Sequence, residues 1–455
     1  MTANKKLTYF ETLVSSFWNS VYFFPAILIV SAAALISDTQ LLGMFVFMAV
    51  CFVLLLFCDD LLSIVCPVLC IFLLSTKYYT DYSKMLPEIL YGAVPTVLAL
   101  IFNIIRYRRP FLSGRFTRPL IAVSAALILG GVGVISVKEY FKPVSLYYML
   151  GLGVLMLLMY FLCMSRLQNE RSYDRTGRMA DILYTAGIVA ALVIFVFYAS
   201  KWNKFIDEGT VLFFKPRNFV SSVLLMTLPA SCLLINRRRI HIIGFALMCI
   251  ALVMSGSRSG LLFGAAVGFV CLVYICYLRA ESIKQHRWYN WAFLAVLVGF
   301  SYLAIRYIPE LYASRMVEGS FISTSETRVD FIRLGIADFL GNPVNGIGIG
   351  NTANIATFKA IVPGSIVFYH NEIIQIIGSM GLIGVAAYSW IFGERIRMIV
   401  YNIRSPLVVF GFSYAGIFAM SMTNPGVFCP FPEAALLILL FALIESESAK
   451  YKQAP

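Results

Sequence analysis

Apolar residues gather in long runs that recur along this chain from Val21 to Ile444. A helix needs roughly 17 to 25 predominantly apolar residues to cross the hydrocarbon core of a bilayer, and most of these runs reach or approach that length. The pattern predicts an all-α polytopic membrane protein. Because the shortest runs also fit half-spans, we expect 12 to 14 transmembrane helices. The predicted spans lie near residues 20–36, 41–57, 61–75, 88–105, 119–136, 145–165, 179–199, 218–235, 240–254, 259–278, 290–308, 371–391, 406–422 and 433–445.

Composition agrees with the pattern and excludes a soluble globule. Of the 455 residues, 60% are hydrophobic and 13% are charged, and the mean hydropathy is +0.83. Such a chain has too few polar residues for a solvated surface. We find no soluble domain, low-complexity linker or repeat of fixed period, so we expect a single integral membrane domain over residues 1–455. The longest polar interruption between two spans is the segment 309–370.

The basic residues predict the orientation of the spans. Lys and Arg collect in cytoplasmic loops, and most of the 36 basic residues fall on one side when the N-terminus is placed inside. Both termini are then cytoplasmic, and the loop 309–370 lies on the extracytoplasmic face. We interpret the net charge of +13 mainly as a result of these cytoplasmic basic residues. Attraction to anionic membrane lipids is a second effect. Nothing resembles a module that binds nucleic acid.

Cysteines and the N-terminus add two expectations. Among the ten cysteines, only Cys429 is predicted outside the apolar runs and their ends, so we expect packing roles and neither a disulfide nor a metal cluster. The N-terminal tail lacks a small-residue cleavage site after a short apolar region. We therefore expect the first span to serve as the insertion signal.

Polar residues in unusual places begin at Lys215. The sequence SGSRSG at 255–260 interrupts an apolar stretch at the predicted outer end of two spans. Arg258 in this segment either snorkels from a tight turn to the lipid headgroups or faces a polar cavity. Gly256, Gly260, Gly264 and Gly268 repeat every fourth residue, which is typical of a closely packed helix face.

A second polar segment, 215–218, precedes the eighth predicted span. Pro216 suits a helix start, and Asn218 has a side chain able to bind backbone donors of the first turn. An interfacial cap and a polar site explain this segment equally well. Lys215 and Arg217 add positive charge to the face that carries Arg258.

The long loop contains helical spacing of apolar residues over 326–340, with Arg328 and Arg333 five residues apart. This pattern predicts an amphipathic helix on the outer surface, and a solvated charge run is the simpler explanation of its arginines. The sequence GIGIG at 346–350 offers backbone N–H groups to an anion, although it lacks the strand and the lysine of a nucleotide-binding loop.

His370 is the only histidine on the predicted outer side, and it stands at the mouth of the twelfth span, followed by Asn371 and Glu372. Because the pKa of histidine lies near neutrality, His370 is a natural proton acceptor. The alternative is a structural histidine at the membrane interface.

Three segments together resemble the O-antigen ligase and polymerase superfamily of bacterial envelope polysaccharide assembly. They are SGSRSG (255–260), ETRVDFIRLGIADFLGNPVNGIGIGN (326–351) and HNEIIQIIGSMGLIG (370–384). Their order and spacing match over roughly residues 210–425. The resemblance implies a GT-C-like fold in the bacterial inner membrane and an inverting glycosyltransferase that needs no metal or other cofactor.

The resemblance also implies substrates and residue roles. The donor is an undecaprenyl-diphosphate-linked glycan, and the acceptor is another glycan, a lipid core or a protein. Arg258 matches the diphosphate-binding arginine of the turn and His370 the catalytic base. Arg328 is our choice for the loop arginine, with Arg333 next and Arg217 as a further candidate. Asn218, Asn371 and Glu372 are supporting residues.

The residues themselves support this chemistry. A departing glycosyl diphosphate is an anion, and guanidinium groups stabilise such charge through bidentate hydrogen bonds. We find no pair of carboxylates on the predicted outer face for a divalent cation, since the doublet Asp59–Asp60 is predicted inside. We prefer a polymerase to a ligase only because polymerases are the broader class across envelopes.

Two alternatives belong to other classes. A flippase for lipid-linked oligosaccharides would carry charges along a central pathway with symmetry between its halves, whereas here they cluster on one face of the second half. A structural partner in a wall-synthesis complex would have no chemistry of its own.

Overall fold

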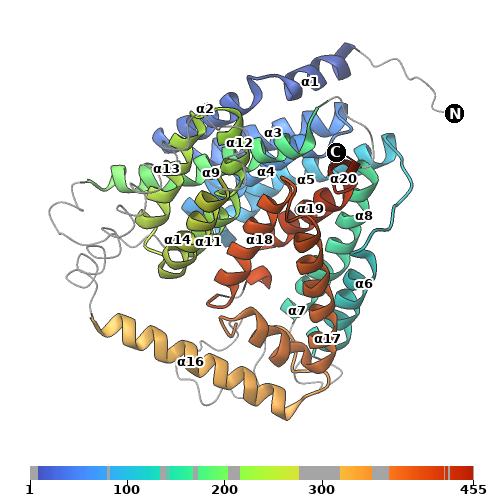
Figure 1. Ribbon diagram of the computed structural model, residues 1–455, viewed down its shortest axis with the longest axis vertical. Coiled ribbons are helices and arrows are strands. Elements are labelled where there is room, and N and C mark those ends of the chain that lie inside the picture. Colours follow the sequence, from blue (N-terminus) through green and yellow to red (C-terminus); the bar gives the residue numbers. More distant parts are fainter. Residues whose placement is uncertain are drawn as a thin grey trace. The chain divides into compact units, whose positions relative to one another are not determined.

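The chain is helical almost throughout the part that the computed structural model describes, and that part contains no strand (Figure 1). The all-α class is therefore confirmed. Within the described residues, the predicted apolar runs fall on helices; the run 290–308 lies outside them, as do the ends of the runs 119–136 and 259–278. The described residues are 9–78, 82–133, 141, 143–167, 173–202, 216–275, 318–350, 368–424, 426–428 and 431–453.

Five described helices are long and apolar enough to cross a membrane, or up to seven spans if each of two bent helix pairs is one span. The sharper bend, of 76°, separates Tyr9–Asn19 from Phe23–Ile36. These features identify a polytopic membrane protein, while the predicted number of 12 to 14 spans and the GT-C-like architecture stay predictions. The five helices are Gln40–Phe57, Met85–Arg106, Ser145–Leu167, Arg175–Ser200 and Glu372–Tyr401.

The chain divides into two compact units, so a single membrane domain over the whole chain stays a prediction. Unit 1 comprises residues Met1–Pro110 and Asn169–Gln285. Its centre is α9, whose mostly small and aliphatic buried face packs against α2, α4, α11, α12 and α13. The helices of unit 1 are α1 (Tyr9–Asn19), α2 (Phe23–Ile36), α3 (Gln40–Phe57), α4 (Leu62–Leu74), η1 (Ser75–Tyr78), α5 (Tyr82–Arg106), α9 (Arg175–Ser200), α11 (Arg217–Thr227), α12 (Ala230–Arg237), α13 (His241–Met254) and α14 (Arg258–Val273).

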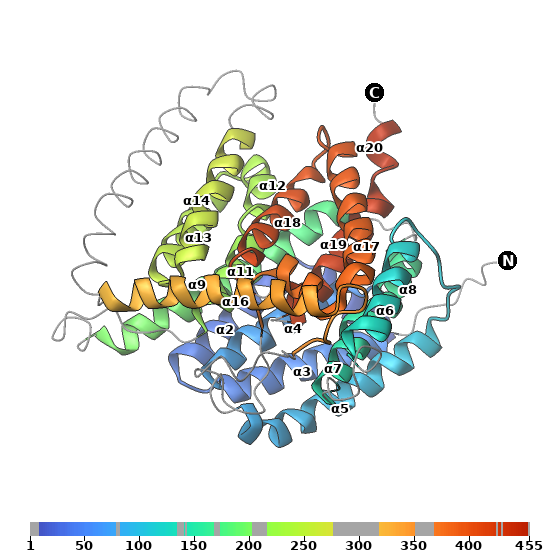
Figure 2. The same ribbon diagram turned by 90° about the horizontal axis from the view of Figure 1, so that it is seen from below.

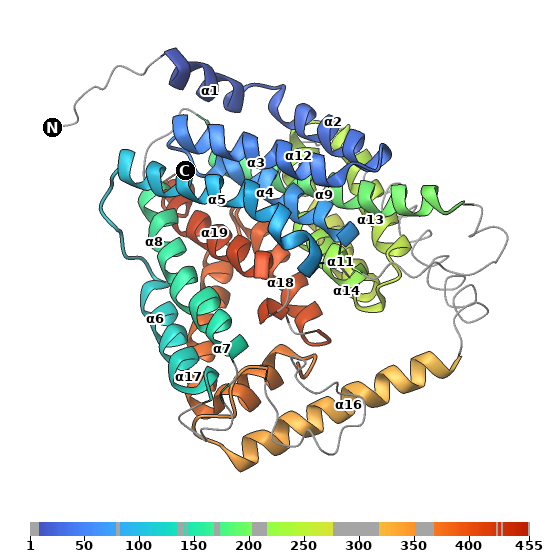
Figure 3. The same cartoon turned by 180° about the vertical axis from the view of Figure 1, so that it is seen from behind.

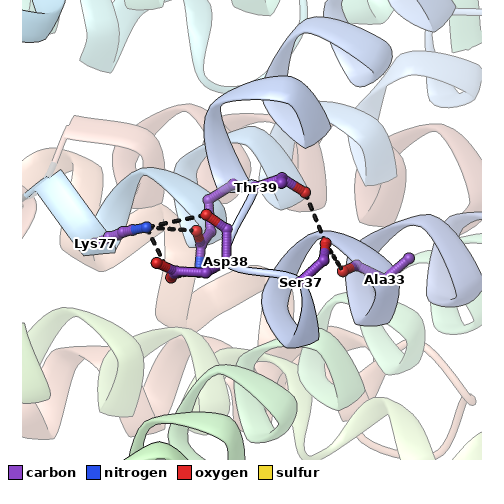
Figure 4. A network of polar contacts seen from close by, with 6 residues as sticks. Ala33, Ser37, Asp38, Thr39 and Lys77 are labelled. Atoms are coloured by element: carbon purple, nitrogen blue, oxygen red, sulfur yellow. Dashed lines mark hydrogen bonds and ion pairs between the residues drawn. The ribbon is translucent and has the colours of Figure 1, made fainter.

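Ion pairs in unit 1 join the ends of these helices. Lys77 of η1 reaches the turn between α2 and α3, where its Nζ lies 2.7 Å from Oδ1 of Asp38 (Figure 4). Three other pairs link segments that the basic-residue pattern assigns to the cytoplasmic face. They are Glu11 with Arg106, Asp59 with Arg109 and Asp174 with Arg237.

Unit 2 comprises Phe111–Gln168 and His286–Pro455. In it, α6, α8 and α17 run side by side, and α19 packs against α8 (Figure 2). The helices of unit 2 are α6 (Thr117–Ala126), η2 (Leu127–Gly131), α7 (Pro143–Tyr148), η4 (Met149–Leu155), α8 (Met156–Leu167), α16 (Glu318–Gly341), α17 (Glu372–Tyr401), α18 (Val408–Ser421), η8 (Gly426–Phe428), α19 (Phe431–Glu447) and α20 (Lys450–Gln453).

Helix α17 is broken at Gly381, whose φ of 57° and ψ of −151° are not helical. Residues 343–348 fill the break with backbone hydrogen bonds. The N–H groups of Ile347 and Gly348 donate to the carbonyls of Gly378 and Ser379, at 3.1 and 2.9 Å. On the other side of the break, Leu382 and Ile383 donate to the carbonyls of Pro343 and Val344. The loop thus replaces bonds that the broken helix cannot make within itself.

The predicted amphipathic helix at 326–340 is part of the longer α16, drawn in gold in Figure 3. The C-terminal part of α16 packs against α17. Leu334 and Asp338 are buried on the side that packs, whereas Val329, Ile336 and Leu340 are exposed. Because α16 packs on α17 along one face, it is positioned to hold side chains beside the start of α17.

Candidate functional site

The turn between α13 and α14 makes Arg258 the first residue of α14. Oγ of Ser257 accepts a hydrogen bond of 3.1 Å from the backbone N–H of Gly260 and so caps the helix. Gly256 has a φ of 70°, in the left-handed region that glycine adopts at little cost. The SGSRSG segment is therefore a tight turn, and its arginine is exposed.

The same turn contacts the start of α11. Ser257 donates a hydrogen bond of 3.0 Å to Oδ1 of Asn218, and Nη1 of Arg217 lies 3.4 Å from the carbonyl oxygen of Gly256. Helix α11 begins at Arg217, directly after Pro216, as the sequence predicts. Asn218 is thus inside the helix and not at its cap, and its side chain binds the turn instead. Unit 1 brings the predicted residues Arg217, Asn218 and Arg258 together, and Lys215 lies outside the described residues.

Two glycines of α14 near this turn allow close packing against neighbouring helices. A Cβ atom at Gly260 would lie 2.6 Å from Cβ of Ser221 on α11, and one at Gly264 would lie 3.0 Å from Leu252. No atom of the described residues lies within 4 Å of the corresponding position at Gly268, although Gly268 itself is buried. These contacts confirm the predicted glycine packing face at Gly260 and Gly264, and at Gly268 it stays a prediction. The packing holds the Arg258 turn against α11.

The second group of predicted residues lies in unit 2, where His370 precedes α17. Its φ of 52° is left-handed, a conformation that residues other than glycine rarely adopt. The imidazole packs against the ring of Phe331 on α16, with 5.4 Å between ring centroids. Burial and the positive charge of Arg328 lower the pKa of His370 below its ordinary value. The lowered pKa favours the neutral imidazole, which is the form able to accept a proton.

The structure separates the two candidate arginines of α16. Arg328 is partly buried and lies within electrostatic range of His370. Arg333 is 76% exposed and forms an ion pair of 3.4 Å with Asp330 on its own helix. Five residues turn an α-helix by about 500°, so the two arginines point in different directions. Arg328 is therefore the arginine that lies near His370. Arg333 is solvated and paired on its own helix, as expected if the arginines of this helix form a solvated charge run.

Asn371 and Glu372 fix the start of α17. Oδ1 of Asn371 caps the helix by accepting a hydrogen bond of 3.0 Å from the N–H of Ile374, and its Nδ2 donates to the carbonyl of Met422. Glu372 is buried, accepts a hydrogen bond from Ser421 and is attracted by Arg395. Both residues therefore tie the helix start to α18 and to the segment that follows it.

The glycine-rich segment does not present its N–H groups to an anion. Four consecutive N–H groups, from Gly346 to Ile349, donate to carbonyls of Asn342, Gly378, Ser379 and Gly131. The phosphate-cradle interpretation is thus wrong for these residues, because the break in α17 and the end of η2 use their donors. Among the described residues, no group of three His, Cys, Asp or Glu side chains is arranged to hold a metal ion.

Comparison with known proteins identifies the class. Residues 243–389 match a protein-family model described as O-antigen ligase. The matched segment contains Arg258, Arg328 and His370, and the fold around it is that of a polytopic membrane protein. The match and the fold together define a membrane enzyme of the ligase and polymerase type. The match over residues 243–389 supports the resemblance to the O-antigen ligase and polymerase superfamily. A search of curated proteins found no match.

Sequence reasoning missed three residues beside His370. They are Phe331, which packs on the imidazole, and the pair Asp338 and Tyr369, which join α16 to the segment before α17. One signal was available, because residues 328, 331, 335 and 338 have helical spacing and Asp338 is a charged residue on that stripe. The hydrogen-bond partner of Asp338 could not be predicted, since nothing in the sequence shows that Tyr369 contacts it.

Proposed function

We propose that the protein is a glycosyltransferase that transfers or polymerises an undecaprenyl-diphosphate-linked oligosaccharide at the extracytoplasmic face of the bacterial inner membrane. The observation that carries the proposal is the pairing of His370 with Arg328 inside the segment that matches the family. A neutral base beside a fixed cation suits a reaction in which a hydroxyl loses its proton while a phosphate group gains charge.

The proposed reaction is an inverting substitution at the anomeric carbon of the donor sugar. The acceptor hydroxyl oxygen attacks from the side opposite the diphosphate, forming the new glycosidic bond as the bond to the phosphate oxygen breaks. The hydroxyl proton passes to the imidazole of His370, and undecaprenyl diphosphate leaves as an anion. The proton, the sugar and the leaving group are then all accounted for, and no redox partner is needed.

Arginine supplies the charge that stabilises the leaving group in this proposal. A guanidinium is always protonated and donates two parallel hydrogen bonds to phosphate oxygens. Arg328 holds this role beside the base. Arg258 and Arg217 are assigned to the donor diphosphate by the resemblance and by their location at one turn of unit 1. We therefore propose a reaction that does not need a metal.

Contacts within each unit agree with the predicted grouping of the loops on two faces. Glu11 with Arg106 and Asp174 with Arg237 join segments that are both predicted cytoplasmic. Asp38 with Lys77 and Asn218 with Ser257 join segments that are both predicted extracytoplasmic. In unit 2, Arg115 packs over the ring of Tyr401, and both are predicted cytoplasmic. Each pair joins segments that are predicted on the same face, and the assignment of that face to the cytoplasm or the exterior rests on the basic residues.

The deciding experiment gives the purified protein a defined undecaprenyl-diphosphate oligosaccharide, with and without a lipid-core acceptor. A polymerase produces a glycan ladder from the donor alone, whereas a ligase produces a new lipid-linked product only when the acceptor is present. We expect the ladder. If neither condition releases undecaprenyl diphosphate, the proposed transferase is wrong.

Two variants test the residues. His370→Ala and Arg258→Ala should each abolish product formation while the protein still inserts into membranes and purifies with normal yield. Full activity in either inserted variant would contradict the assigned role. A flippase would instead move labelled donor across vesicles without forming a glycosidic bond. Dissipating the proton gradient would disturb a gradient-coupled flippase and leave a purified transferase active.

A further inference from the structure

Tyr369, the residue before the proposed base, is locked into unit 2 by its ring. The side chain is fully buried and lies between two glycines, Gly335 of α16 and Gly378 of α17. A Cβ atom at Gly335 would lie 3.2 Å from the tyrosine ring, and one at Gly378 would lie 2.8 Å from it. Since both positions lack a side chain, the ring fits closely between the two helices.

The hydroxyl of Tyr369 adds a directional bond to this packing. Its Oη donates a hydrogen bond of 2.6 Å to Oδ2 of Asp338 on α16. Asp338 is only 2% exposed, so the bond is shielded from water. A buried carboxylate needs such a donor, and a buried hydroxyl without a partner is costly. The bond therefore favours one arrangement of α16 against the segment that carries His370.

Asp338 lies on the same face of α16 as the two residues that contact or influence His370. Arg328, Phe331, Gly335 and Asp338 follow one another at intervals of three, four and three residues, which places them on one stripe of α16. Phe331 and Arg328 act on His370, and Gly335 and Asp338 hold Tyr369. A rotation or one-residue slip of α16 would break the Tyr369 bond and would also remove Arg328 from the imidazole.

The backbone of His370 needs this support. Its left-handed φ is disfavoured for a residue with a side chain, so the neighbours on both sides must hold it. The N–H of Tyr369 donates to Oε1 of Gln375 at 3.0 Å, and Asn371 on the other side caps α17. Loss of the Tyr369–Asp338 bond would leave only the backbone bond to Gln375 on this side of His370.

We propose that Tyr369 and Asp338 are positioning residues that fix α16 in register with His370, so that Arg328 and the base act on the same donor. This proposal rests on the proposed glycosyltransferase function. Neither residue touches the reacting atoms in it. Both act through the placement of Arg328 and His370.

The test compares turnover in purified, folded variants. Tyr369→Phe removes only the hydroxyl, and we expect kcat to fall on the order of 10-fold to 100-fold because a misplacement of about 1 Å costs that much. The KM for the lipid-linked donor should change far less. Asp338→Leu should act in the same way, and Asp338→Asn, which keeps an oxygen acceptor for the tyrosine, should restore most of the turnover. The double variant Tyr369→Phe with Asp338→Leu should be no slower than the slower single variant.

A matched control separates positioning from general stability. Tyr160 of α8 is also fully buried, and its hydroxyl donates a hydrogen bond of 2.7 Å to Glu445 of α19. Glu445 also accepts from the N–H of Arg115, whose side chain lies over Tyr401 at the C-terminal end of α17, the end remote in sequence from His370. Tyr160→Phe should lower the Tm about as much as Tyr369→Phe does, with kcat unchanged. Equal kcat losses in both variants would overturn the proposal.

The outcomes also distinguish this proposal from the function on which it rests. If His370→Ala is inactive and Tyr369→Phe keeps the kcat of the unaltered protein, the positioning role is wrong and the function stands. If His370→Ala is fully active, the base assignment fails, and with it the reason for holding His370. A loss of kcat in Tyr369→Phe that Asp338→Asn does not share supports the proposal.

Discussion

The guanidinium of Arg328 lies close enough to the imidazole of His370 to lower its pKa, in addition to the effect of burial. The two residues are 42 positions apart and belong to different elements, α16 and the segment before α17. A positive charge beside an imidazole disfavours the imidazolium form, so the neutral base persists to lower pH. In the proposed reaction, this relationship would couple the charge that binds the donor to the group that accepts the proton.

The first prediction concerns pH. Activity should fall on the acidic side as His370 takes up a proton and can no longer act as a base. Removing the nearby charge with Arg328→Gln raises the pKa of His370 toward its ordinary value, so the acidic limb of the kcat profile should move to higher pH. Arg333→Gln, which removes an exposed arginine paired with Asp330, should leave the position of the limb unchanged. A shift to lower pH, or the same shift in both variants, would contradict the electrostatic assignment.

A second prediction concerns the turn that carries Arg258. Ser257→Ala removes the cap of α14 and the hydrogen bond to Asn218, and it should lower the free energy of unfolding by about 1 to 2 kcal/mol. Denaturant titration in detergent micelles measures this loss. Ser257→Thr keeps the hydroxyl and should lose much less. The expectation fails if alanine and threonine at this position are equally stable.

The third prediction tests the loop that fills the break in α17. Gly346 has a φ of 69°, and a Cβ atom there would lie 2.3 Å from the carbonyl carbon of Ser379. Gly346→Ala should therefore destabilise the protein by at least about 2 kcal/mol. Gly393→Ala is the matched control, because no atom of the described residues lies within 4 Å of its Cβ position and the residue is helical. It should be neutral or stabilise by up to about 1 kcal/mol. Thermal unfolding of the two variants should diverge accordingly.

The fourth prediction concerns metal ions. Because arginines supply the positive charge in the proposed reaction, treatment of the purified enzyme with EDTA should leave the rate of glycan formation unchanged. The rate is measured before chelation, after chelation and after addition of Mg²⁺. Loss of activity in EDTA with recovery in Mg²⁺ would show that the charge-stabilising group is a cation.

The helices could be predicted from the sequence because lipid exposure demands continuous apolar runs, and runs such as 41–57 and 179–199 became α3 and α9. The number of membrane spans could not be predicted from the sequence. Helices α11 and α12 meet at a bend of 44°, and several apolar helices are short. The break at Gly381 was also hidden. A glycine in an apolar run fits an unbroken span equally well, and only the loop that pairs with the break shows what the glycine does.

The sequence was enough to predict which kinds of residue form the candidate site and which segments carry them. His370 stands out because protonatable residues are rare at the edge of an apolar run, and the segments containing Arg258 and Arg328 carry the family resemblance. Sequence spacing did not decide between Arg328 and Arg333, because that choice depends on which face of α16 meets α17. Tyr369 was missed for the same reason, since a tyrosine beside a span is ordinary until its buried partner Asp338 is known.

The break in α17 also constrains how the protein is made. The carbonyls of Gly378 and Ser379 are satisfied by residues that emerge from the ribosome before them, and the N–H groups of Leu382 and Ile383 depend on the same loop. An unpaired backbone group costs several kcal/mol in hydrocarbon, so the broken form of this helix needs the loop beside it. The break and the loop 343–348 can therefore form only together, which makes the folding of this region cooperative.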